Sequence, residues 1–78
     1  MLGFDRITFD PSVMGGRACI RGMRVTVSLI LNLVANGMSV EEIVHAYPYV
    51  EADDIRQALQ YAAWLAEESV HVVEPAAA

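Results

Sequence analysis

The chain has 78 residues, of which 55% are hydrophobic and 19% charged, with a formal net charge of −5 at pH 7. This composition excludes a disordered tail and predicts one folded domain over residues 1–73, followed by a flexible tail at 74–78. We find no apolar run near the roughly 18 residues of a membrane span and no signal-peptide pattern, so we expect a cytoplasmic protein.

So short a chain needs support beyond its own core, because it buries only about 60% of its unfolded surface. Cys19 is the single cysteine, which excludes an intrachain disulfide. Together Cys19, His45 and His71 have neither the number nor the spacing of a zinc site, so we expect no metal and no other cofactor. The remaining means of support is a second subunit, and the sequence predicts a homodimer.

The charges are divided unevenly along the chain. Residues 1–24 carry four arginines and two acids, a net charge of +2, whereas residues 25–78 carry one arginine and eight acids, a net charge of −7. This division predicts two faces with different partners, one a polyanion and the other a basic protein.

Residues 5–26 predict a β-rich part. Ile7 and Phe9 alternate with polar neighbours, which is typical of a short half-buried strand, and Asp10 with Pro11 ends it. Residues 17–26 predict a hairpin whose two-residue loop is Arg21-Gly22, because glycine tolerates the positive φ that such turns require.

In the expected hairpin register, Ile20 faces Met23 on an apolar side and Cys19 faces Arg24 on a polar side. The same register places Ala18 opposite Val25 and Arg17 opposite Thr26.

Arg17, Arg21 and Arg24 thus form a basic ribbon, and arginine offers phosphate a planar fork of donors. The ribbon predicts nucleic-acid binding, but an ordinary hairpin whose arginines satisfy nearby carboxylates explains the pattern equally well.

Residues 27–68 predict a helical part whose first helix, from about Thr26 to Asn36, ends at Gly37. This helix has one polar stripe, at Ser28, Asn32 and Asn36, and is apolar elsewhere. So much apolar surface exceeds what a small monomer buries, which predicts a dimer interface at Leu29, Ile30, Leu33 and Val34.

Two further helices follow, and together they have the outline of a helix-turn-helix. Ser39 and Glu42 form a capping box that opens a helix through about Ala46. The last helix runs from about Ala52 to Glu68, with Ile43 and Ile55 facing inward. One face of it carries Ile55, Ala58, Leu59, Ala62, Leu65 and Ala66, and we expect the aromatic side chains Tyr61 and Trp64 in the core.

Three acids, Glu51, Asp53 and Asp54, occupy the first turn of the last helix. Carboxylates there suit the helix dipole but repel phosphate, so base reading by this turn is unfavourable. They suit a basic protein instead, and we predict them as partner-binding residues.

Several segments together resemble one family, the domain of unknown function 433. They are Ile7-Thr8-Phe9-Asp10-Pro11, Met14-Gly15-Gly16-Arg17, Ile20-Arg21-Gly22-Met23-Arg24-Val25 and Gly37-Met38-Ser39-Val40-Glu41-Glu42-Ile43, and the similarity continues through Tyr47-Pro48 and Asp54-Ile55-Arg56-Gln57-Ala58-Leu59. Ala18, Met23 and Thr26 depart from the proline, threonine and proline usual in that family.

The resemblance implies a small dimeric winged helix-turn-helix-like domain, classed with VapB-type antitoxins that neutralise a PIN-like ribonuclease and bind their own operator. The expected fold is α+β, a short N-terminal strand and a β-hairpin followed by a three-helix bundle. The alternative function is a DNA-binding transcriptional regulator without a toxin partner. We expect no enzyme and no small-molecule substrate, because the candidate nucleophile and bases are scattered along the chain.

The segment Val70-His71-Val72-Val73 has the composition of a strand. It fits an edge of the partner's sheet or a terminal strand packed on its own domain or on the other subunit, and the sequence does not separate these interpretations.

Overall fold

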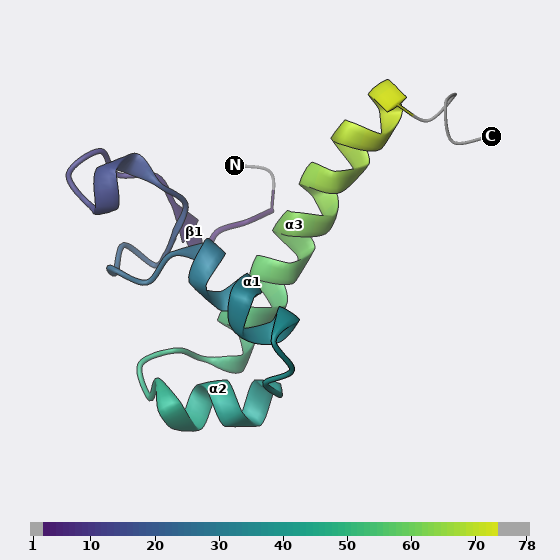
Figure 1. Cartoon of the computed structure of the whole chain (residues 1–78). Coiled ribbons are helices and arrows are strands. Elements are labelled where there is room, and N and C mark those ends of the chain that lie inside the picture. Colours follow the sequence, from purple (N-terminus) through teal and green to yellow (C-terminus); the bar gives the residue numbers. More distant parts are fainter. Residues whose placement is uncertain (1–2, 74–78) are drawn as a thin grey trace.

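The computed structural model describes residues 3–73 and has the predicted α+β fold (Figure 1). The elements run in the order β1 (Ile7–Thr8), the 3₁₀ turn η1 (Met14–Gly16), β2 (Cys19–Ile20), α1 (Val27–Ala35), α2 (Val40–Ala46) and α3 (Ala52–Val73). Both α1 and α2 pack against α3, so the long helix forms the centre of the domain. Within residues 3–73, no helix combines the length and the apolar composition needed to cross a membrane.

The sheet has two strands, and its register corrects the predicted hairpin. β1 pairs antiparallel with β2, Ile7 opposite Ile20. Cys19 pairs with Thr26, not with Arg24, and the Ile20 amide donates to the Val25 carbonyl at 2.8 Å.

The predicted loop residues do form the turn, because the Met23 amide donates to the Ile20 carbonyl at 2.8 Å across Arg21 and Gly22. The chain rejoins its partner strand only at Val25, so the loop has four residues and the register shifts. Cys19 and Thr26, expected on a polar side, are 1% and 8% exposed.

The helix ends follow the sequence signals closely. Thr26 caps α1 by accepting a hydrogen bond from the Leu29 amide at 3.0 Å. Gly37, with φ 94°, ends α1 in a Schellman motif, in which its own amide donates to Val34 and the next amide donates to Leu33. The predicted capping box of Ser39 and Glu42 opens α2.

A compact set of aliphatic side chains from both strands, all three α-helices and the loops at Val25 and Val50 forms the core, and Ile43 and Ile55 face inward as predicted, each 0% exposed. The buried members are Ile7, Ile20, Val25, Val27, Ile30, Ile43, Val50, Ile55 and Ala58.

The second half of α3 projects beyond the rest of the domain (Figure 1). The apolar face of this helix is buried only in part, since Leu59 and Leu65 are 40% and 44% exposed and Ala66 is exposed as well. The shorter elements cover only the first turns of α3. The segment 70–73, with its strand-like composition, is the end of this helix and not a strand, because the helical pattern begun at Ala52 continues through it. The expected tail, 74–78, lies outside the described residues.

Candidate functional site

A buried carboxylate at the start of α3 joins three parts of the chain. Asp54 has no exposed side-chain surface. Its oxygens accept hydrogen bonds from Arg6 Nη1 at 2.8 Å, from Arg21 Nε at 3.1 Å and Nη2 at 3.0 Å, and from the Glu51 amide at 2.8 Å. The N-terminal strand region, the turn after β2 and the first turn of α3 are thus tied to one side chain.

The electrostatics of this cluster favour the ionised carboxylate. Burial raises the pKa of Asp54, but the hydrogen bonds from Arg21, the Glu51 amide and Arg6 outweigh it, and the net pKa lies below the ordinary value of 3.8. The pKa of Arg6 is raised by its hydrogen bonds to Glu51 and Asp54. The pKa of Arg21 is raised chiefly by its hydrogen bond to Asp54. Both arginines therefore stay charged and paired.

Arg21 consequently occupies a different position from the one the basic ribbon requires. Its guanidinium also donates to the Tyr49 carbonyl at 2.7 Å, and its side chain is 36% exposed. For this residue the structure corresponds to the alternative in which a hairpin arginine satisfies a nearby carboxylate. Arg6, which the sequence reasoning overlooked, pairs with a carboxylate 48 positions away, and no local pattern signals so distant a partner.

The other two predicted ribbon arginines remain on the surface. Arg17 and Arg24 are exposed, and neither forms an ion pair among the residues that the structure describes. They are the arginines of the hairpin region that stay available to an anionic partner.

The three acids predicted to bind a partner differ sharply in accessibility. Glu51 and Asp53 have side chains that are 59% and 54% exposed. Glu51 pairs with Arg6 at 2.8 Å, and Asp53 pairs with Arg56, which lowers the pKa of Asp53. Asp54 is buried and contributes to the fold. The prediction that it binds a partner is therefore wrong.

The predicted dimer-interface residues of α1 also separate by burial. Ile30 is 0% exposed and belongs to the core of its own chain, so the prediction that it lies in a dimer interface is wrong. Leu29, Leu33 and Val34 are partly buried and pack against that core. Each retains surface that a second subunit can cover.

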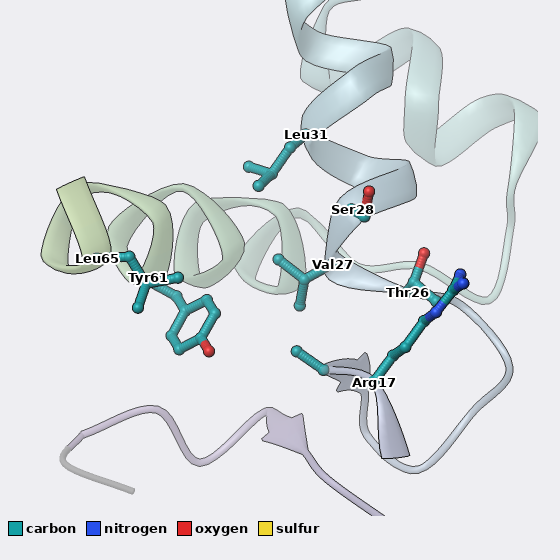
Figure 2. A pocket seen from close by; sticks show the side chains of 8 residues that line it. Arg17, Thr26, Val27, Ser28, Leu31, Tyr61 and Leu65 are labelled. Carbon is teal, nitrogen blue, oxygen red and sulfur yellow. The ribbon is translucent and has the colours of Figure 1, made fainter. Parts of the chain in front are cut away.

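An open, mainly apolar hollow of about 320 Å³ lies between α1, α3 and the residues before β2 (Figure 2). Figure 2 shows Val27 and Leu31 of α1 facing Tyr61 and Leu65 of α3 across it, with Arg17 at one edge. Tyr61 lies within an aromatic group and is half-buried, as is Trp64, so these two residues flank the core instead of lying inside it as expected. The ring contacts of Tyr61 are with Phe4 at 5.5 Å, Phe9 at 6.2 Å and Trp64 at 6.2 Å.

The residues considered for metal or nucleophilic chemistry lie apart. Cys19 is buried at 1% exposure, and His45 is exposed near the end of α2. Over the described part of the chain, no three histidine, cysteine or acidic side chains gather into a group that could hold a metal ion. The described residues offer instead charged and apolar surfaces and the ion-pair cluster around Asp54.

Comparison with known proteins identifies relatives of uncharacterised function. Residues 7–62 match the sequence model of a family described as protein of unknown function (DUF433). An uncharacterized protein, y4eO, from Sinorhizobium fredii is 41% identical over 56 residues, which is 72% of this chain and 25% of the relative. The chain therefore spans about a quarter of that relative's length. No solved structure matches the chain.

Proposed function

This chain belongs to the protein of unknown function (DUF433) family, and from that membership we propose that it is a dimeric, antitoxin-like binding protein. In this proposal it neutralises a PIN-like ribonuclease in a type II toxin–antitoxin pair and binds its own operator DNA as a second activity. The VapB-type assignment, the homodimer and the cytoplasmic location belong to the same proposal.

The observation that supports the proposal best is the separation of the charges left over after internal pairing. The cationic side chains without an ion-pair partner in residues 3–73 include Arg17 and Arg24, both before α1. Exposed acids lie later in the chain, at Glu41 and Glu42 on α2 and at Glu67 on α3. An acid-free segment with two unpaired arginines, followed by a strongly acidic part of the chain, suits two partners of opposite charge.

A ribonuclease fits the acidic surface because a protein that binds RNA needs a basic face, and an inhibitor that covers this face benefits from complementary charge. The exposed carboxylates of Glu51 and Asp53 extend the acidic surface to the start of α3. The apolar hollow beside Leu65 supplies a second kind of contact for a protein partner.

The experiment is co-expression of the tagged chain with the adjacent reading frames, followed by pull-down. Neutralising the exposed acids with Glu51→Gln and Asp53→Asn should weaken recovery of the partner, increasingly so at higher salt. Asp5→Asn with Asp10→Asn is the matched control, because it removes the same charge from the N-terminal segment. Equal recovery of the partner with both double variants would show that Glu51 and Asp53 do not bind it.

The alternative function, a DNA-binding regulator without a toxin, is supported by the two unpaired hairpin arginines. Pull-down separates the two functions directly. A DNA fragment recovered without any protein partner favours the regulator, whereas a co-purifying ribonuclease whose activity falls on binding favours the antitoxin.

A further inference from the structure

We propose that α1, and not α3, is the helix that lies against DNA, with Arg17 and Arg24 holding the phosphates beside it. This inference rests on the DNA-binding part of the proposed function and specifies its surface. A helix-turn-helix interpretation of α2 and α3 places the contact at the start of α3 instead.

The segment that includes α1 is the longest stretch of the chain without an acidic residue. Residues 11–40 contain three arginines and not one aspartate or glutamate, although the chain has ten such acids. One of those arginines, Arg21, is neutralised by Asp54. The other two remain exposed, so this segment is basic on its surface while the protein as a whole is acidic.

The outer face of α1 has the side chains that read base edges. Ser28 and Asn32 are exposed and succeed each other along one face, and Asn36 follows one turn later at the C-cap. The opposite face is fixed in the core by Val27 and Ile30, which are 3% and 0% exposed. The amide oxygen of asparagine can accept a hydrogen bond from the N6 amino group of adenine in the major groove, and a nine-residue helix fits a groove about 12 Å wide.

The amides of this stripe keep their acceptors for a ligand. Asn32 Nδ2 donates to the Ser28 carbonyl at 2.9 Å and to Ser28 Oγ at 3.5 Å, and Asn36 Nδ2 donates to the Asn32 carbonyl at 2.7 Å. These bonds orient each amide along the helix, and no hydrogen bond within the described chain uses either Oδ1.

The arginines flank the beginning of the same helix. Arg17 borders the hollow that Thr26 and Ser28 also line, and Figure 2 shows its guanidinium beside Thr26 at the start of α1. Arg24 lies two residues before Thr26 in the chain. Phosphate contacts at this end would set the orientation of α1 on the duplex, while the stripe supplies sequence discrimination.

The start of α3 is, by contrast, closed to DNA. Arg6 and Arg21 lie over its first turn, where they bind Asp54 and, for Arg6, Glu51. Inserting this turn into a groove would require breaking these ion pairs and bringing exposed carboxylates next to phosphate.

The test compares two duplexes, the DNA upstream of the chain's own gene and a scrambled duplex of equal length and composition. Asn32→Ala should weaken binding to the upstream duplex about 5- to 150-fold and leave binding to the scrambled duplex unchanged. Arg17→Ala with Arg24→Ala should weaken binding to both duplexes alike. Gln60→Ala and Arg56→Ala on the exposed surface of α3 are the matched controls and should change neither affinity.

Loss of binding with the two α3 variants, and none with Asn32→Ala, would overturn the assignment and return the contact to α3. If the unaltered chain binds neither duplex, the inference fails together with the DNA-binding part of the proposed function. Recovery of a ribonuclease in the pull-down would show that the antitoxin part stands independently. Far-ultraviolet circular dichroism checks that each variant is folded. Alanine favours the helix at an exposed position, so we expect the α1 and α3 variants to fold.

Discussion

Replacing Asp54 by asparagine tests whether the ion-pair cluster stabilises the fold. The substitution keeps the size of the side chain but removes the charge that two guanidinium groups face. Breaking a buried ion pair by removing one partner costs about 3–5 kcal/mol. The arginine side chains are 27% and 36% exposed, so water screens them, and we expect the lower end of that range, about 3 kcal/mol.

Such a loss is large for this domain. The per-residue range of protein stability gives a 78-residue chain about 4–12 kcal/mol in total. We therefore expect the midpoint of thermal unfolding to fall by about 12–24 °C. In urea, with a slope near 1 kcal/mol per molar, the midpoint should fall by about 3 M.

The assay is urea unfolding followed by circular dichroism, at one fixed protein concentration so that any dimerisation contributes equally. Asp53→Asn is the control, because it removes the same charge one position earlier, from a side chain that is 54% exposed. The control should lose far less stability than Asp54→Asn, because the ion pair of Asp53 with Arg56 is exposed to water. If the two variants unfold at the same urea concentration, Asp54 is not a structural anchor and the reasoning from its burial is wrong.

Four further predictions follow from the same geometry. Because the folded pKa of Asp54 lies below 3.8, its stabilisation is complete above that pH and disappears as pH falls through the folded pKa. Urea midpoints measured from pH 5 to 2 should therefore fall further in the unaltered chain than in Asp54→Asn, in which only the lowered pKa values of Asp5, Asp10 and Asp53 still contribute. Gly22→Ala should lower the free energy of unfolding by about 1–2 kcal/mol, because Gly22 has φ 72° and a side chain is strained in that conformation. An unchanged urea midpoint would contradict this prediction. With two unpaired hairpin arginines per subunit, a dimer should show a log–log salt slope for DNA binding near −3.6, against about −5 if all three took part. Leu29→Gln should shift the light-scattering mass to one subunit while Leu65→Gln leaves it unchanged; a dimer that survives Leu29→Gln would exclude the α1 interface.

Local signals predicted the helices of this protein well, because each signal acts within a few residues. Thr26, Gly37 and the Ser39–Glu42 box mark helix ends through hydrogen bonds that span at most five positions, and the structure has each of them. The sequence also indicated the turn at Arg21-Gly22 from the backbone freedom of glycine. The α+β class follows from these elements in order.

The predictions that failed depend on more than the local helix and turn signals. The hairpin register was wrong because the loop is longer than its two central residues, and turn composition does not fix where pairing resumes. The apolar face of α3 includes Leu65, which is nevertheless 44% exposed, because helical periodicity cannot show where the neighbouring elements stop covering a helix. Whether an arginine binds phosphate or an internal carboxylate depends on contacts across 33 or more positions, as with Arg21 and Asp54.

The conformation of the turn after β2 explains why Arg21 is structural. Arg21 and Gly22 both have positive φ, 46° and 72°, which is uncommon for a side chain as large as arginine. This backbone directs the guanidinium onto Asp54 and the Tyr49 carbonyl, and its hydrogen bonds there offset the unfavourable φ. A turn held in this way also fixes β2 before it and the start of α1 after it. The buried carboxylate of α3 therefore determines where Arg17 and Arg24 stand, although it touches neither, and loss of Asp54 should disturb any DNA contact through the fold and not through charge.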